Sequence, residues 1–138
     1  MNKTIKTKLF LLSIATIASI GFLSCKKPAG EGGRATIKGK IYMQNYNSTF
    51  TVIIDENYAA GENVYITYGD NPAVANTTKS SHDGSFEFPY LRKGKYTVFA
   101  VSKDPNSNGL TGTIAIKKEV LINDKKDVIN VGDIIIIK

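Results

Sequence analysis

The sequence predicts an all-β domain, a sandwich or a barrel, behind an N-terminal export segment. From Arg34 to Lys138, short runs alternate between apolar and polar residues, and no helix-length stretch repeats with a helical period. Turn residues interrupt these runs about every ten positions, which is the spacing found in all-β sandwiches and barrels. The export segment is predicted by an N-terminal group of lysines followed by an uncharged apolar run.

The first two predicted strands cover residues 35–43 and 62–68. Successive side chains of a strand point to opposite faces, so the alternation separates a core face from an outer face. Lys38, Lys40 and Tyr42 are predicted to point outward. The residues predicted to point into the core are Ile37, Gly39, Ile41, Met43, Val64 and Ile66.

The middle of the folded part predicts two further strands. Asp83-Gly84, a dipeptide typical of hairpin turns, precedes a run in which Phe86 and Phe88 face one way and Glu87 faces the other. Residues 95–102 are apolar on both faces, as expected of a central strand.

The last predicted strands cover residues 111–122 and 127–138. Gly132 is predicted to mark a β-bulge that switches the inward face of the final strand. Residues 44–60 form an insertion, in which the stretch from Phe50 to Ile54 has strand composition. We expect either an extension of the first strand or an extra edge strand there.

The N-terminus has the order of a secretory signal peptide. Its lysines precede the uncharged run from Leu9 to Leu23, and small Ser24 and Cys25 follow. A transmembrane anchor helix is the alternative. A membrane span needs about 20 apolar residues, however, and this run stops short of that length. The lysines of the charged start are Lys3, Lys6 and Lys8.

The formal net charge of +6 overstates how basic the folded part is. Three of the 18 basic residues precede Cys25 and none of the 12 acidic residues does, so 15 minus 12 leaves +3 from Cys25 onward. This mild excess is spread along the chain, and no basic helix or arginine cluster appears in the sequence. A nucleic-acid partner is therefore not expected.

No constellation of catalytic residues is visible, so an enzyme is not expected. Ser81, His82 and Asp83 include the residue types of a catalytic triad, but the members of real triads converge from distant segments. His82 is the only histidine, which leaves few ligands for a transition metal. We expect no cofactor and no metal.

Residues 104–109 match the first half of a calcium loop, D-x-N-x-N-G. The second half departs from the pattern, because Ala115 stands where a calcium loop has glutamate. These residue types also make ordinary turns. A plain turn is the expectation here, and calcium binding from Asp104 to Gly109 is the alternative.

Several tyrosines are candidates for stacking on sugars or contacting peptides. Tyrosines are also common on the faces of sandwiches, and the chain has no tryptophan. The candidates are Tyr42, Tyr46, Tyr58, Tyr65, Tyr68 and Tyr90.

The stretch Phe22-Leu23-Ser24-Cys25 resembles the lipobox of bacterial lipoproteins, including those of the Bacteroidota type. The resemblance implies that residues 1–24 are a signal peptide, that the peptide is cut before Cys25, and that acyl chains (diacylglycerol and a fatty acid such as palmitate) attach at Cys25. Phe22 departs from the usual leucine. Membrane lipid would then be a partner through acylated Cys25, and residues 25–34, rich in Pro and Gly, would be a flexible tether.

Lipoprotein sorting gives a further expectation by resemblance. Lys26 rather than aspartate after the cysteine favours the outer membrane. Surface-exposed lipoproteins carry acidic residues just after the cysteine, and only Glu31 qualifies here. The choice between the periplasmic and the surface leaflet stays open.

Residues 84–98 are similar to a signature of the carboxypeptidase-regulatory-like and Cna-B-like domains, which have the transthyretin-like (prealbumin-like) fold. The signature reads Gly-x-Phe-x-Phe, then Leu, then Gly-x-Tyr-x-apolar, and is met here by Gly84, Phe86, Phe88, Leu91, Gly94, Tyr96 and Val98. The resemblance implies one seven-stranded Greek-key sandwich over residues 35–138 and usually no catalysis.

Some Cna-B-like members form a Lys–Asn isopeptide bond, which needs a lysine that points inward from the first strand. The alternation places Lys38 and Lys40 outward, so we do not expect this bond, although Asn130 would be its partner. We expect a non-catalytic, lipid-anchored envelope protein whose sandwich binds or scaffolds at the membrane surface. The alternative is an accessory subunit that binds glycans or peptides for an outer-membrane uptake system.

Overall fold

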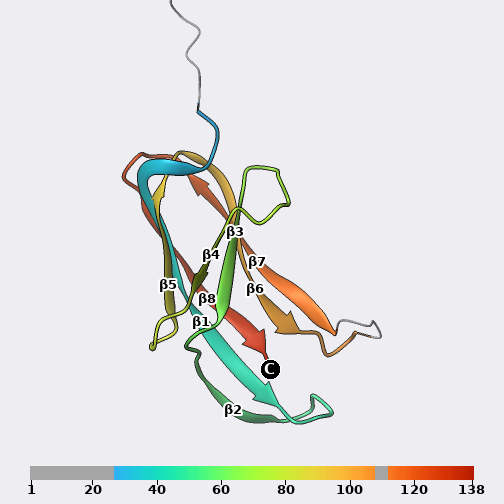
Figure 1. The fold of residues 1–138 in the computed structure, drawn as a ribbon. Coiled ribbons are helices and arrows are strands. Elements are labelled where there is room, and N and C mark those ends of the chain that lie inside the picture. The colour runs from blue at the N-terminus through green and yellow to red at the C-terminus, as the bar shows by residue number, and fades with distance from the viewer. Residues whose placement is uncertain (1–26, 108–111) are drawn as a thin grey trace, which may run out of the picture.

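The computed structural model describes residues 27–107 and 112–138 as an all-β sandwich (Figure 1). The predicted signal peptide and Cys25 lie outside the described residues. The described residues form eight strands: β1 (Glu31–Tyr46), β2 (Ile53–Tyr58), β3 (Asn63–Tyr68), β4 (Asn76–Lys79), β5 (Ser85–Leu91), β6 (Gly94–Lys103), β7 (Thr113–Ile122) and β8 (Val128–Ile137).

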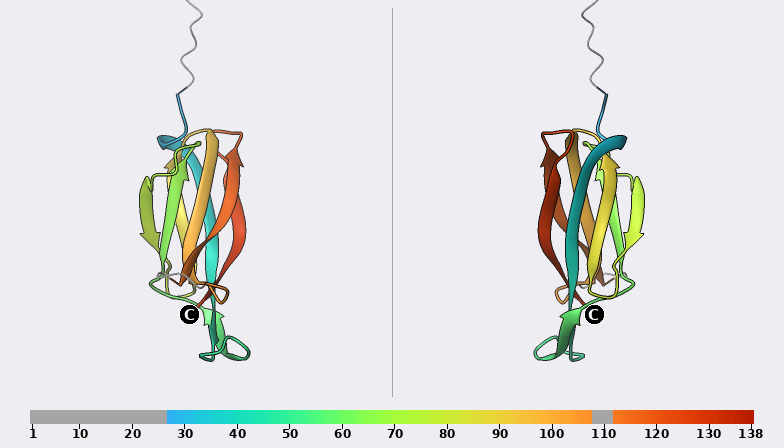
Figure 2. Two further views of the ribbon diagram at one scale, coloured as in Figure 1. Left: turned by 90° about the vertical axis from the view of Figure 1, so that its right-hand side faces the viewer. Right: turned by 90° about the vertical axis from the view of Figure 1, so that its left-hand side faces the viewer.

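The strands form two four-stranded sheets that face each other (Figure 2). In the first sheet, β1 is central. One edge of β1 pairs antiparallel with β5 and, further along, with β2, while its other edge pairs parallel with β8. The second sheet has the order β4-β3-β6-β7 and is antiparallel throughout. Central β6 confirms the strand that the sequence predicts from its two apolar faces.

The two inward faces meet in one hydrophobic core. Phe86 and Phe88 enter it from β5, and their rings pack edge to face at 6.2 Å. Each large apolar side chain buried here stabilises the fold by roughly 1.5–3 kcal/mol. The alternation predicted for β1, β3 and β5 is confirmed by the burial of Ile37, Ile41, Val64, Ile66, Phe86 and Phe88.

The strand count differs from the seven that the resemblance implies. β2 accounts for the eighth strand, so of the two alternatives for residues 44–60 the structure has the extra edge strand, although it lies at Ile53–Tyr58 and shares only Ile53 and Ile54 with the stretch of strand composition from Phe50 to Ile54. β4, with the sequence NTTK, is not predicted from the sequence. It is short, polar and mostly exposed, and its register along β3 is what makes it a strand.

Gly132 produces the predicted bulge in β8. Lys38 pairs with Asn130 and Lys40 with Asp133, so β8 carries one residue more than β1 between these pairs. Gly132 has a φ of 71°, a conformation that glycine adopts without strain. Beyond the bulge the inward positions become Ile134 and Ile136, both fully buried.

The folded part begins earlier than the predicted boundary at residue 35. β1 starts at Glu31, inside the stretch 25–34 that the sequence predicts to be a tether. The hydroxyl of buried Tyr96 accepts the N–H of Gly30 at 2.9 Å, and the carbonyl of Gly30 accepts the N–H of Arg92 at 2.8 Å. The segment that follows Pro28 is therefore fixed to the end of the sandwich.

Among the described residues, no helix has the length and apolar character needed to cross a bilayer.

Candidate functional site

The hairpin of β1 and β2 projects beyond the end of the sandwich, opposite the end where the chain joins β1 (Figures 1 and 2). All six residues of β2 are exposed, and β2 pairs with β1 only. Three consecutive apolar side chains are largely in solvent: Val52 is 58% exposed, Ile53 41% and Ile54 71%. We call residues 52–54 the apolar tip.

The apolar tip has a defined conformation. The side-chain oxygen of Asn47 accepts the backbone N–H groups of Thr51 at 2.8 Å and Val52 at 3.3 Å. The side-chain amide of Asn47 donates to the Thr51 hydroxyl at 2.9 Å. A bulge in the β1–β2 register falls at Ile54 and turns its side chain outward. The hairpin therefore presents its apolar residues in a fixed arrangement.

Acidic side chains flank the apolar tip. Asp55 and Glu56 follow it directly and, as neighbours on a strand, lie on opposite faces of β2. Gln44 on β1 donates to Glu56 at 3.2 Å. No basic residue occurs between Lys40 and Lys79 in the sequence. The hairpin thus combines exposed apolar side chains with uncompensated negative charge.

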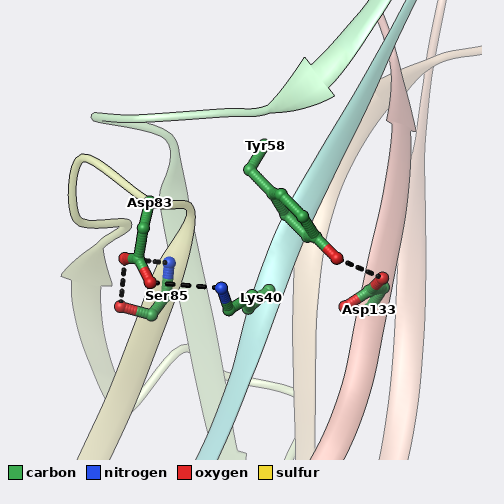
Figure 3. Close-up of polar contacts among 5 residues, drawn as sticks. All are labelled: Lys40, Tyr58, Asp83, Ser85 and Asp133. Carbon is green, nitrogen blue, oxygen red and sulfur yellow. Dashed lines mark hydrogen bonds and ion pairs between the residues drawn. The ribbon is translucent and has the colours of Figure 1, made fainter.

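A polar cluster lies where the hairpin joins the sandwich (Figure 3). Lys40 Nζ is 3.1 Å from Asp83 Oδ2 and 4.6 Å from the centre of the Tyr58 ring. The Tyr58 hydroxyl donates to Asp133 Oδ2 at 3.4 Å. The rings of Tyr42 and Tyr58 pack edge to face, with their centres 5.2 Å apart. We call Lys40, Tyr58, Asp83, Ser85 and Asp133 the base cluster.

Hydrogen bonds hold Asp83 in its charged form. Asp83 Oδ1 accepts the Ser85 hydroxyl at 2.6 Å and the Ser85 backbone N–H at 3.2 Å. These bonds, and then Lys40, lower the pKa of Asp83 well below its ordinary value. The β4–β5 turn can approach Tyr58 of β2 closely because Gly84 has no side chain. A Cβ at position 84 would lie 2.9 Å from Tyr58 Cβ. The base cluster therefore fixes the hairpin against the β4–β5 turn.

A shallow hollow of about 710 Å³ lies beside the base cluster. Its lining includes Lys38, Lys40 and Lys79 together with Glu87 and Asp133, so charges of both signs face it. None of the six candidate tyrosines lines it. Its one aromatic lining residue, Phe86, is only 4% exposed, so the hollow offers little aromatic surface on which a sugar could stack.

The outward orientation predicted for Lys38 and Lys40 is confirmed. Lys38 pairs in register with Glu87 on one side and Asn130 on the other, and all three are exposed on the outer face of the first sheet. Neither Lys38 nor Lys40 therefore provides the inward lysine that isopeptide formation in Cna-B-like domains needs.

The candidate tyrosines are dispersed over the molecule. Tyr42, Tyr46 and Tyr58 belong to the β1–β2 hairpin, Tyr68 packs on Tyr96 at the opposite end, and Tyr90 is 71% exposed on β5. Tyr65 stacks on Phe99 at 5.1 Å on the outer face of the second sheet. Sequence reasoning finds each tyrosine but cannot group them.

The structure does not join Ser81, His82 and Asp83 into a triad. Asp83 is bonded to Ser85 and Lys40, and His82 is exposed in the turn. In the proposed calcium loop, Asp104 Oδ1 accepts the backbone N–H of Asn106 at 2.9 Å, as in an ordinary Asx turn. Asn108 and Gly109 lie outside the described residues.

Sequence reasoning missed the base cluster. Lys40, Tyr58 and Asp133 come from three strands, and only their register places them together. The nearest sequence signal is Asp83-Gly84 followed by a serine, a pattern typical of a tight hairpin turn.

No family model matches the chain, and no curated protein matches it. Among solved structures, one similar chain is that of a Pseudomonas aeruginosa protein described as a proposed carbohydrate-binding protein. The two share 12% identity with a TM-score of 0.45, over 80% of this chain and 92% of the other.

Proposed function

We propose that this chain is a non-catalytic, lipid-anchored envelope protein whose β1–β2 hairpin binds a partner protein away from the membrane. One observation carries the proposal: three consecutive large apolar side chains are exposed on a hairpin of fixed conformation. Exposed apolar patches with polar rims mark interaction sites in soluble domains.

The anchor is proposed at Cys25, from the lipobox resemblance. Two or more acyl chains hold a protein at a bilayer far more firmly than one, because each buried CH₂ contributes about 0.8 kcal/mol. The chain joins the sandwich at the end opposite the hairpin (Figure 1). With the domain upright on such an anchor, the apolar tip would be the part of the domain furthest from the bilayer.

The family of the domain is part of the same proposal. We propose that the sandwich belongs with the carboxypeptidase-regulatory-like and Cna-B-like domains. Its support is that the apolar signature residues are all buried in the core: Phe86, Phe88, Leu91, Tyr96 and Val98.

The partner surface that fits the hairpin is apolar at its centre and basic at its rim. Asp55 and Glu56 would face basic side chains, and the apolar tip would enter the centre. A second copy of this chain pairing through β2 would bring carboxylates opposite each other, which is unfavourable. The charges and the bulge on β2 thus discourage self-association while leaving the tip exposed.

Site-specific photocrosslinking tests the binding surface. A photoreactive residue at Val52 in the lipidated protein, in native membranes, should give one discrete adduct. The matched control is the same residue at Val101, a 42% exposed position on the outer face of the second sheet. Reversing the charges with Asp55→Lys and Glu56→Lys should remove the adduct. The proposal fails if Val52 and Val101 give the same products, or if charge reversal changes nothing.

Replacing Cys25 tests the anchor. Cys25→Ser removes the thiol needed for thioether formation, so radiolabelled fatty acid should no longer be incorporated and the processed form should disappear. If Cys25→Ser leaves labelling and processing unchanged, the anchor lies elsewhere.

A second candidate function is glycan binding on the outer face of the second sheet. The stacked Tyr65 and Phe99 rings form an aromatic surface there. Tyr65→Ala should weaken oligosaccharide binding in a glycan array, whereas Tyr90→Ala should not.

A further inference from the structure

The charges of the domain are divided between its two ends. Residues 27–34, 69–75, 92–95 and 123–127 form the end where the chain joins β1, which we call the N-terminal pole (Figure 2). The opposite end, with the hairpin, comprises residues 44–62, 80–84, 103–107 and 138 and is called the hairpin pole.

The N-terminal pole is basic and the hairpin pole is acidic. The hairpin pole has five acidic and two basic residues, a net charge of −3: Asp55, Glu56, Glu62, Asp83, Asp104, Lys103 and Lys138. The N-terminal pole has four acidic residues, Glu31, Asp70, Asp124 and Asp127, and seven basic residues, a net charge of +3. The basic residues are Lys27, Arg34, Arg92, Lys93, Lys95, Lys125 and Lys126. The modest overall charge therefore hides a strong asymmetry.

Several contacts join the segments of the N-terminal pole into one surface. Lys93 Nζ on the β5–β6 turn lies 3.5 Å from Asp124 on the β7–β8 turn. Tyr96 and Arg92 fix Gly30, and the N–H of Gly69 donates to the carbonyl of Lys95 at 2.8 Å. Glu31 accepts the Asn76 side-chain amide at 2.7 Å and the Tyr68 hydroxyl at 3.1 Å. The basic side chains are thus carried on a rigid end of the sandwich.

The distance from this pole to a lipid at Cys25 is short. Five residue steps separate Cys25 from Gly30, and such a stretch spans at most about 18 Å even when fully extended. Lysines within a Debye length of about 8 Å from an anionic surface are attracted to it. A lipid at Cys25 would therefore allow the basic pole to reach the headgroups.

We propose that the N-terminal pole is a lipid-facing surface that docks on anionic phospholipid headgroups and holds the sandwich upright on the membrane. This inference rests on the lipid attachment proposed above. A lipid anchor alone supplies attachment but fixes no orientation. The basic pole adds a second, electrostatic contact through each lysine or arginine near the surface, and the acidic hairpin pole is repelled from the same surface.

Hydrogen exchange of the lipidated protein tests the docking. The protein is reconstituted in vesicles of phosphatidylcholine alone and in vesicles that also contain roughly one quarter phosphatidylglycerol. We expect amides of the β7–β8 turn, residues 123–127, to exchange several-fold more slowly on the anionic vesicles. Raising the salt until the Debye length is about 3 Å should remove the difference.

The chain offers a matched pair of variants. Lys125→Ala with Lys126→Ala removes two lysines from the N-terminal pole, whereas Lys117→Ala with Lys118→Ala removes two from the middle of β7. The first variant should lower the ratio of docked to undocked molecules about ten- to thirty-fold, from the loss of two surface lysines. The second changes the net charge equally and should behave as the unmodified protein does.

The possible outcomes separate the two proposals. If the protein fails to float with phosphatidylcholine vesicles, the lipid anchor is wrong. If it floats with both kinds of vesicle but the turn exchanges at the same rate on each, the anchor stands and the docking is overturned. Docking is also overturned if the two double variants lose protection equally, because the effect would then follow net charge and not the N-terminal pole.

Discussion

Tyr96 shows how one side chain sets where the folded domain begins. Its ring is in the core with 1% exposure, while its hydroxyl donates to the Arg92 carbonyl at 2.8 Å and accepts the N–H of Gly30. Tyr96→Phe keeps the ring but leaves that buried N–H without its partner. We expect a free energy of unfolding lower by about 1–3 kcal/mol, measured by urea denaturation.

Tyr65→Phe is the matched control for this prediction. It also removes a tyrosine hydroxyl, but from the outer face, where the ring stack with Phe99 is kept. We expect a change within about 0.5 kcal/mol. If Tyr96→Phe falls in the same range, the hydroxyl does not hold the N-terminal segment in place.

The lowered pKa of Asp83 predicts how the stability of the fold changes at acidic pH. Its native pKa is lower than the ordinary value of 3.8, so it stabilises the fold above that pH, and this contribution is lost as the pH falls through the native pKa. Asp83→Asn should therefore show a shallower loss of stability on acidification than the unmodified protein. Thermal unfolding across the acidic range measures this, and Ser85→Ala should lie between the two. Parallel curves for all three proteins would contradict the assignment.

At the scale of elements, the β1–β2 hairpin depends on its own turn rather than on the core. Its conformation is set by Asn47, and β2 buries no side chain. Asn47→Ala should loosen the hairpin and increase its proteolysis, while the free energy of global unfolding changes by less than about 1 kcal/mol. Limited proteolysis beside urea denaturation separates the two effects. A large global change would show that the hairpin and the sandwich unfold together.

The elements also show how far the sequence could be interpreted. Strands with a buried face, such as those of Ile37 and Phe86, are predictable because burial imposes the alternation. The bulge at Gly132 is predictable because glycine interrupts an apolar run. β4 is not, because its pairing with β3 leaves no pattern in a polar sequence.

The candidate site was harder to predict than the fold. The insertion at residues 44–60 is visible in the sequence, but its strand composition at residues 50–54 places the strand several residues before most of β2. That Lys40 lies between Asp83 and the Tyr58 ring depends on pairings between strands far apart in sequence. The sequence also fails to predict that Ala29 to Glu31 are part of the folded domain. Pro and Gly residues indicate a flexible linker, and the hydrogen bond from Gly30 to the hydroxyl of distant Tyr96 is not visible in the sequence.

At the scale of the whole molecule, the length of β1 predicts how far the apolar tip stands from the bilayer. Glu31 and Ala35 both pair with Leu91, so β1 runs straight only from Ala35 to Tyr46, and these 11 steps at about 3.3 Å each span roughly 35 Å from the N-terminal pole to the hairpin. If the pole docks on headgroups, a fluorophore at Asn123→Cys should lie within about 20 Å of labelled lipid, and one at Thr49→Cys at least about 35 Å away.

Energy transfer from each labelled protein to acceptor lipids measures these distances, and the thioether expected at Cys25 would not react with the dye. On anionic vesicles the two positions should differ as stated. With Lys125→Ala and Lys126→Ala, the transfer from the Thr49 label should increase, because the domain would tilt about its linker and bring the hairpin nearer the surface. Equal transfer from both labels on anionic vesicles would mean that the sandwich lies flat on the membrane. The hairpin would then lie beside the bilayer, and the upright orientation would be contradicted.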